Sequence, residues 1–140
     1  MKPVYNRLLL KLSGEVLAGD AGHGFDFNVI DDVCKAIKEV TDKGVQVGIV
    51  VGGGNFWRGR SSGAMDRTRA DSIGMLATVM NSLALQQGFL DIGVEARVQS
   101  AVQITGVVET FIRDEAVRHL EKGRVVIFAG GTGNSFFSTD

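Results

Sequence analysis

Two short glycine-rich segments share one pattern that is suited to binding an anion. Gly52-Gly53-Gly54-Asn55 and Gly131-Thr132-Gly133-Asn134 each follow an apolar run of the kind that forms a buried strand. Glycine lets the backbone approach a phosphate closely and permits positive φ, so that successive N–H groups can point at one anion. The two turns are therefore expected to bind a phosphorylated small molecule.

Two cationic side chains stand near these turns in the sequence. Lys11 lies at the end of an apolar run and directly precedes Leu12, Ser13 and Gly14, while Arg58 follows the triple glycine. Arg58 could hold phosphate oxygens through two parallel hydrogen bonds, whereas Lys11 would act as a compact charge beside a transferring group. We expect the segment from Lys11 to Gly14 to join the other two turns at one ligand site.

The standard glycine motifs are not matched. Gly52 and Gly54 begin a G-x-G-x-x-G, but Trp57 stands at the third glycine position and no Gly-Lys-Ser/Thr follows. The alternative is that these glycines only make tight turns between strands and helices. Two similar turns together with a lysine at a strand end favour phosphate binding.

These segments need strands and helices to position them, and the hydrophobic pattern predicts both in alternation. Strands are expected at 7–12, 45–51, 96–100 and 125–129, and helices at 28–43, 68–87 and 113–121. The first helix has Asp26 or Asn28 as its cap and Gly44 beyond its end. In the second, the residues expected to face the core are Ile73, Leu76, Val79, Met80 and Leu83.

The alternation of strands and helices predicts an α/β fold, a three-layer sandwich with a mostly parallel sheet. In such sheets, ligands bind outside the carboxyl ends of the strands, where all three polar turns are expected. With 140 residues and 44% hydrophobic content, the chain has the size of one domain. No linker divides it.

Composition also narrows the classes of function. Fifteen Lys and Arg against 16 Asp and Glu give a net charge of -1, which provides no overall field for nucleic acid or an acidic membrane surface. The apolar run near the amino terminus is too short for a signal sequence or a membrane span, so a cytoplasmic location is expected. Cys34, the single cysteine, is expected to be a buried hydrophobe and not a nucleophile.

The two histidines, three aromatic residues and a methionine-containing stretch are expected to have structural roles. His23 and His119 have no second ligand at metal spacing, so surface positions without a metal are expected. Trp57, Phe136 and Phe137 are expected to pack beside strand ends, with stacking on a base as the alternative. The region from Met65 to Met80 is expected to be helix core.

Four strings, taken in order along the chain, carry a resemblance to a known family. They are Leu9 to Glu15, Val51 to Asn55 with Arg58-Gly59, Asp71 followed by Gly74 to Asn81, and Gly131 to Asp140. Together they resemble the bacterial uridylate (UMP) kinases of the amino acid kinase superfamily. Family members continue past the position of Asp140 into a region that holds the adenine of ATP and a further catalytic aspartate. Residues 1–140 are therefore expected to form the amino-terminal UMP-binding lobe, without the carboxyl-terminal lobe.

The resemblance implies a donor side and a catalytic set. Lys11, Leu12, Ser13 and Gly14 would approach the phosphates of ATP, with Lys11 offsetting charge on the group in flight. Gly54 and Arg58 would face the donor phosphates or the transferred group, and Asp140 would orient the lysine. The implied catalytic residues are Lys11, Arg58 and Asp140.

The resemblance also implies an acceptor side. Gly53 would face the phosphate of UMP, and Asp71 would accept hydrogen bonds from the sugar hydroxyls. For Asp71 alone, a favourable interaction with the helix dipole is the alternative. The uracil and the UMP phosphate would be enclosed by Thr132, Gly133, Asn134, Ser135, Phe136, Phe137, Ser138 and Thr139.

The implied function is ATP-dependent phosphorylation of UMP to UDP in pyrimidine nucleotide biosynthesis, with Mg²⁺ bound to ATP. Family members form hexamers, and the stretch Gly19 to Gly24 falls where they respond to GTP as an activator. Because the adenine site lies beyond Asp140, these residues alone are expected to bind UMP weakly and to show no turnover. The alternatives are another amino acid kinase, or a non-catalytic module that binds nucleotides or oxyanions.

Overall fold

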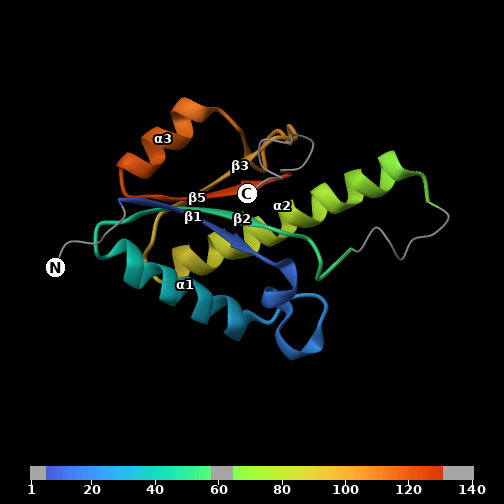
Figure 1. Ribbon diagram of the computed structural model, residues 1–140, viewed down its shortest axis with the longest axis horizontal. Helices are drawn as coiled ribbons and strands as arrows, with labels where there is room; N and C mark the ends of the chain where they lie inside the picture. The colour runs from blue at the N-terminus through green and yellow to red at the C-terminus, as the bar shows by residue number, and fades with distance from the viewer. Residues whose placement is uncertain (1–5, 58–64, 131–140) are drawn as a thin grey trace.

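The computed structural model describes residues 6–57 and 65–130, which form a parallel sheet covered by helices on both faces (Figure 1). The strand order is β1-β2-β5-β3-β4, and every neighbouring pair is parallel. The elements in chain order are β1 (Arg7–Leu12), the 3₁₀ segment η1 (Gly14–Ala21), α1 (Phe27–Thr41), β2 (Gln46–Val51), α2 (Arg67–Asp91), β3 (Ala96–Ser100), β4 (Glu109–Thr110), α3 (Arg113–Glu121) and β5 (Val125–Ala129).

The direction of the crossovers explains why helices cover both faces. The chain moves across the sheet in one direction from β1 to β2 to β3, and it returns from β4 to β5, between β2 and β3. Since parallel crossovers are right-handed, reversing the direction places the connecting helix on the opposite face. Figure 1 shows α3 on one side of the sheet and α1 on the other. The expected three-layer α/β fold with a parallel sheet is confirmed.

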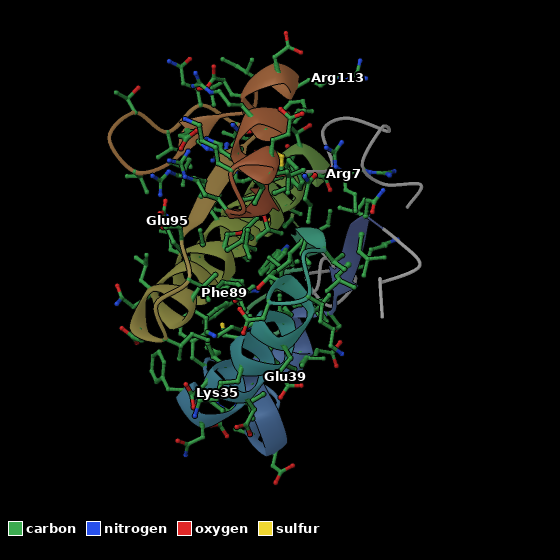
Figure 2. The ribbon with its side chains drawn as sticks, turned by 90° about the vertical axis from the view of Figure 1, so that its left-hand side faces the viewer. Arg7, Lys35, Glu39, Phe89, Glu95 and Arg113 are labelled. Carbon is green, nitrogen blue, oxygen red and sulfur yellow. The ribbon has the colours of Figure 1, made fainter. Side chains whose placement is uncertain are left out.

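The larger core lies between the sheet and the α1–α2 layer. It contains buried side chains from both helices and from the strands, among them Ile49, Leu85 and Phe89, each 0% exposed. Figure 2 shows Phe89 inside the molecule, with Lys35 and Glu39 on the outer side of α1. A smaller cluster of Ala116, Leu120 and Val126 lies beneath α3.

The predicted elements are confirmed with small changes at their ends. Asp26, not Asn28, is the cap of α1, because its Oδ1 accepts hydrogen bonds from the backbone N–H groups of Asn28 at 3.0 Å and Val29 at 3.3 Å. The second helix is longer than expected and ends at Asp91. The sequence pattern missed η1 and β4, since neither segment carries a hydrophobic period long enough to recognise.

The expected core face of α2 is partly wrong. Val79 is buried, but Leu76 is 50% exposed and Met80 is 44% exposed, so the stretch from Met65 to Met80 is not helix core throughout. Where it lies against the glycine turn, the buried face of α2 carries small and polar residues such as Ala77 and Asn81, because the backbone of the turn leaves no room for large side chains. Although α2 has 25 residues, no helix in the described ranges is long and apolar enough to cross a membrane.

The surface position expected for His119 is also wrong. Its residue exposure is 6%, and its ring lies between Glu109 and Arg124, with Nε2 3.0 Å from Glu109 Oε1 and Nδ1 3.1 Å from an Arg124 nitrogen. Arginine can only donate, so Nδ1 accepts and Nε2 donates to the carboxylate. Burial opposes ionisation of Glu109, but hydrogen bonds from His119 and Gln99 outweigh it and lower the pKa of Glu109. His23, by contrast, is exposed.

Cys34 is buried between α1 and α2, as expected, and its thiol donates to the Leu85 carbonyl at 3.7 Å. Burial, with smaller contributions from the negative charges of Asp31 and Asp91, raises the pKa of Cys34 to about 12. The thiol is therefore protonated at neutral pH and is a poor nucleophile. Gly88 of α2 lies opposite, and this glycine allows the two helices to approach closely.

Replacing Gly88 tests this helix contact. A Cβ at this position would lie 2.9 Å from Cys34 Sγ and 2.9 Å from Ile30 Cγ2. Overpacking of this kind costs about 1–3 kcal/mol, while alanine gains about 1 kcal/mol of helix propensity over glycine. Gly88→Ala is therefore expected to lower the free energy of unfolding by about 1 kcal/mol, measured by urea denaturation.

Gly74→Ala in the same helix is the matched control. A Cβ there would meet Trp57 Cδ1 at 3.4 Å, an ordinary contact, so the gain in helix propensity should remain. A Gly88→Ala variant as stable as Gly74→Ala would contradict the close approach of the two helices.

Candidate phosphate-binding site at the strand ends

The turns after β1 and β2 lie against each other at the carboxyl ends of these strands. The register pairs Lys11 with Val50 and Leu12 with Val51, and the Gly52 N–H donates to the Leu12 carbonyl at 2.9 Å. The two chains therefore leave the sheet side by side. The expectation that these two turns meet at one edge is confirmed.

Gly14 brings the two turns into backbone contact. A Cβ at Gly14 would lie 2.6 Å from the Gly52 carbonyl oxygen and 2.7 Å from the Gly54 nitrogen. No other residue type fits there without a shift of the backbone. Ser13 precedes it as the cap of η1, with its hydroxyl accepting from the Glu15 N–H at 3.2 Å.

The triple-glycine turn also lies directly on α2. A Cβ at Gly53 would come within 2.8 Å of the Ala77 Cβ and 3.2 Å of the Gly74 carbonyl oxygen. The Gly53 carbonyl accepts the N–H groups of Phe56 and Trp57, each at 3.0 Å, which closes the turn. The turn is thus confined by η1 on one side and by α2 on another.

Lys11 is exposed at the carboxyl end of β1. The alternate residues Leu8, Leu10 and Leu12 pack against the larger core, so Lys11 and Leu9 occupy the opposite face of the strand, the face that α3 covers elsewhere. An exposed ammonium group on this edge strand, one residue before the turn, is placed to reach an anion bound at the strand ends.

Asp71 is exposed on the amino-terminal part of α2. The helix begins at Arg67 and its cap is Asp66, whose Oδ2 accepts from the Arg69 N–H at 3.4 Å, so Asp71 lies one turn inside the helix and does not cap it. At spacings of three and four residues, Asp71 shares one face of α2 with Gly74, Thr78 and Asn81. The same face contacts the glycine turn.

The end of β5 joins the same arrangement. Gly130 has a φ of 65°, and its N–H donates to Thr78 Oγ1 at 2.7 Å. The third predicted turn follows, but the residues after Gly130 lie outside the described residues. The predicted site residues that lie outside the described residues are Arg58, Thr132, Gly133, Asn134, Ser135, Phe136, Phe137, Ser138, Thr139 and Asp140.

The sequence places Asn55 in the first glycine turn and Asn81 at the end of one of the four strings, but it does not predict that these two side chains hold the turns. Asn55 is 2% exposed and Asn81 is 0% exposed, and they hydrogen bond to each other and to the turn backbone. Glu15 also lies beside this turn, since its Oε1 would be 3.3 Å from a Cβ at Gly54. One feature of the sequence could have indicated this role. Polar residues recur at helical spacing on α2 beside an apolar stripe, and this pattern is typical of a helix that packs on polar backbone.

Metal ligands do not cluster at this edge in the part of the chain that the structure describes. Within residues 6–57 and 65–130, no group of three or more His, Cys, Asp or Glu side chains could hold a metal ion. The site offers backbone amides and a lysine instead. Backbone amides and a lysine are groups that can bind phosphate oxygens.

Open α/β sheets bind their ligands outside the carboxyl ends of the strands, and the two glycine turns of this parallel sheet lie there. Comparison with known proteins gives the particular family. Residues 6–140 match the profile of the Amino acid kinase family, and the chain belongs to this family.

Solved structures show the same relationship. The chain is 40% identical to a UMP kinase from Bacillus anthracis over 93% of its length, with a TM-score of 0.87, and 36% identical to a UMP kinase from Ureaplasma parvum over 92%, with a TM-score of 0.86. An isopentenyl phosphate kinase from T. acidophilum, 19% identical over 86% of the chain and 53% of its own, shares the fold with a TM-score of 0.62. The matches cover 55% and 57% of the two UMP kinases, so the chain spans little more than half their length.

Replacing Gly14 tests the backbone contact between the turns. In Gly14→Ala, the new Cβ would collide with backbone atoms, which cannot rotate away as a side chain can. A loss of about 2–3 kcal/mol in the free energy of unfolding is expected, within the range for overpacking, and urea denaturation would measure it.

Gly52→Ala serves as the control on the facing turn. A Cβ there would lie 3.4 Å from the Gly14 nitrogen and 3.8 Å from the Leu12 carbonyl oxygen, both ordinary contacts. Equal stability of the two variants would show that the turns are not in contact at Gly14.

Proposed function

We propose that this chain supplies the UMP-binding and phosphate-binding part of a uridylate kinase, which transfers a phosphoryl group from ATP to UMP in pyrimidine nucleotide biosynthesis. The observation that carries the proposal is the backbone contact of Gly14 with Gly52 and Gly54, beside the exposed Lys11. The similarity to two UMP kinases over nearly the whole chain favours UMP as the acceptor.

The proposed reaction needs positioning and charge compensation more than covalent chemistry. A UMP phosphate oxygen attacks the terminal phosphorus of ATP, a new P–O bond forms, the bond to the bridging oxygen breaks, and UDP and ADP leave. Because a phosphate oxygen is the nucleophile, no side chain has to act as a strong base. Mg²⁺ carried by ATP would offset charge on the donor phosphates.

Each described residue has a definite task in this proposal. Lys11 would offset the charge that develops on the transferred group, and the backbone N–H groups near Gly14 and Gly54 would hold the donor phosphates. Gly53 would face the phosphate of UMP. Asp71 would accept hydrogen bonds from the ribose hydroxyls, since it extends the face of α2 that lies against the turn. The roles of Arg58 and Asp140, the enclosing segment Thr132 to Thr139, a hexameric assembly, GTP activation and a cytoplasmic location remain predictions of the family resemblance.

Calorimetric titration of the chain with UMP, UDP, ATP and molybdate tests the proposed function. UMP or UDP is expected to bind with a dissociation constant of about 1 μM to 1 mM, the range that is usual for enzyme substrates. Binding of molybdate without uridine nucleotides would favour the non-catalytic oxyanion module. If neither uridine nucleotide binds, the UMP kinase assignment fails.

Removing the charge of Lys11 tests the donor side. Lys11→Met is expected to weaken ATP binding about tenfold, which corresponds to about 1.4 kcal/mol, while UMP binding changes less. Arg7→Met is the matched control, because Arg7 lies on the same face at the other end of β1 and bonds to Gln46. Equal losses of ATP affinity in both variants would mean that only general positive charge is involved.

A further inference from the structure

A closed pair of buried amides lies behind the triple-glycine turn. Asn55 Nδ2 donates to Asn81 Oδ1 at 2.9 Å, and Asn81 Nδ2 donates to Asn55 Oδ1 at 2.8 Å. Asn55 comes from the turn itself, whereas Asn81 comes from the middle of α2. The two side chains therefore connect the turn to the helix by reciprocal hydrogen bonds.

The second N–H of each amide is used on the backbone. Asn81 Nδ2 also donates to the Gly52 carbonyl at 2.6 Å, and Asn55 Nδ2 also donates to the Gly24 carbonyl at 2.9 Å. Since a carbonyl can only accept, these two bonds fix which end of each side chain is nitrogen. The Gly24 N–H in turn donates to the Asn55 carbonyl at 3.0 Å. All four amide hydrogens of the pair are thus engaged.

This use of every donor explains why both positions carry asparagine. A leucine at either position would leave buried carbonyls without a partner, and an aspartate would place an acceptor where a donor is needed. The pair holds Gly52 on one side and the loop at Gly24 on the other. Asn81 is the member fixed on a helix, so it supplies the rigid reference for both.

We propose that Asn81 is a positioning residue of the phosphate site: through Gly52 and Asn55 it fixes the backbone of the triple-glycine turn in the conformation that receives a nucleotide phosphate. Thr78, one turn earlier on the same face, holds the Gly130 N–H, so one face of α2 sets the ends of both β2 and β5. The proposal rests on the proposed function for the identity of the ligand, but not for the coupling between Asn81 and the turn.

Two isosteric variants separate positioning from loss of polar burial. Asn81→Asp and Asn55→Asp add the same charge at sites that are both at least 98% buried. Asn81→Asp removes the donors to Gly52 and to Asn55 Oδ1. Asn55→Asp keeps both of those bonds, and it loses the donors to Gly24 and to Asn81 Oδ1. Leu85→Ala is the control for stability. Leu85 is 0% exposed on the same helix, and its apolar side chain makes no hydrogen bond to either turn.

The first measurement is the affinity for UMP and for ATP with Mg²⁺, set beside the thermal unfolding midpoint of each variant. Asn81→Asp is expected to weaken nucleotide binding at least tenfold more than Asn55→Asp does, while Leu85→Ala lowers the midpoint without changing affinity at temperatures where it is folded. Losses of affinity that simply follow the unfolding midpoint across all three variants would overturn the proposal.

Hydrogen exchange supplies a second measurement that needs no ligand. In Asn81→Ala, the amide protons of Gly24, Phe56 and Trp57 are expected to exchange at least tenfold faster relative to the Ile49 amide of β2 than they do in the unsubstituted chain. In Leu85→Ala, all four should change together. A uniform change in both variants would overturn the coupling. If the unsubstituted chain binds no nucleotide but Asn81→Ala shows the selective exchange, only the proposed function is refuted.

Discussion

The contact between two backbone turns, at a point where no Cβ fits, is the constraint on which the rest of this site depends. A Cβ at Gly14 would lie 2.6 Å from the Gly52 carbonyl oxygen and 2.7 Å from the Gly54 nitrogen, which is too close for any side chain. Such contact requires β1 and β2 to be adjacent and parallel and to end at the same level, which their register provides. The sheet therefore serves to bring two loops together at its carboxyl edge.

The unusual face of α2 follows from the same constraint. A helix that packs on a glycine turn lies close to polar backbone groups, so it needs small side chains and hydrogen-bonding groups where most helices carry leucine. Ala77 gives room beside Gly53, while Thr78 and Asn81 donate to or accept from the turns around them. The large apolar residues Leu76 and Met80 are displaced to an exposed position. One face of α2 thus both packs on the glycine turn and holds it by hydrogen bonds.

The chain belongs to the Amino acid kinase family, and the described site is composed mainly of backbone and of uncharged polar side chains. This suits phosphoryl transfer, in which the reacting groups bring their own charge and nucleophile and the protein must hold them in line. In the proposed function, rigidity of the turns is a functional property as much as a structural one. The reciprocal amide pair between Asn55 and Asn81 gives that rigidity a specific origin.

The sequence alone determined the alternation of strands and helices, the parallel sheet and the glycine turns at the strand ends, because these depend on local periodicity and turn chemistry. The four strings along the chain also indicated the family. Only the tertiary structure decided which face of α2 is buried, why His119 is inside, and how Gly14 meets Gly52. These features join residues far apart in the chain, and a pattern read along one segment contains no information about the surface that the segment will meet.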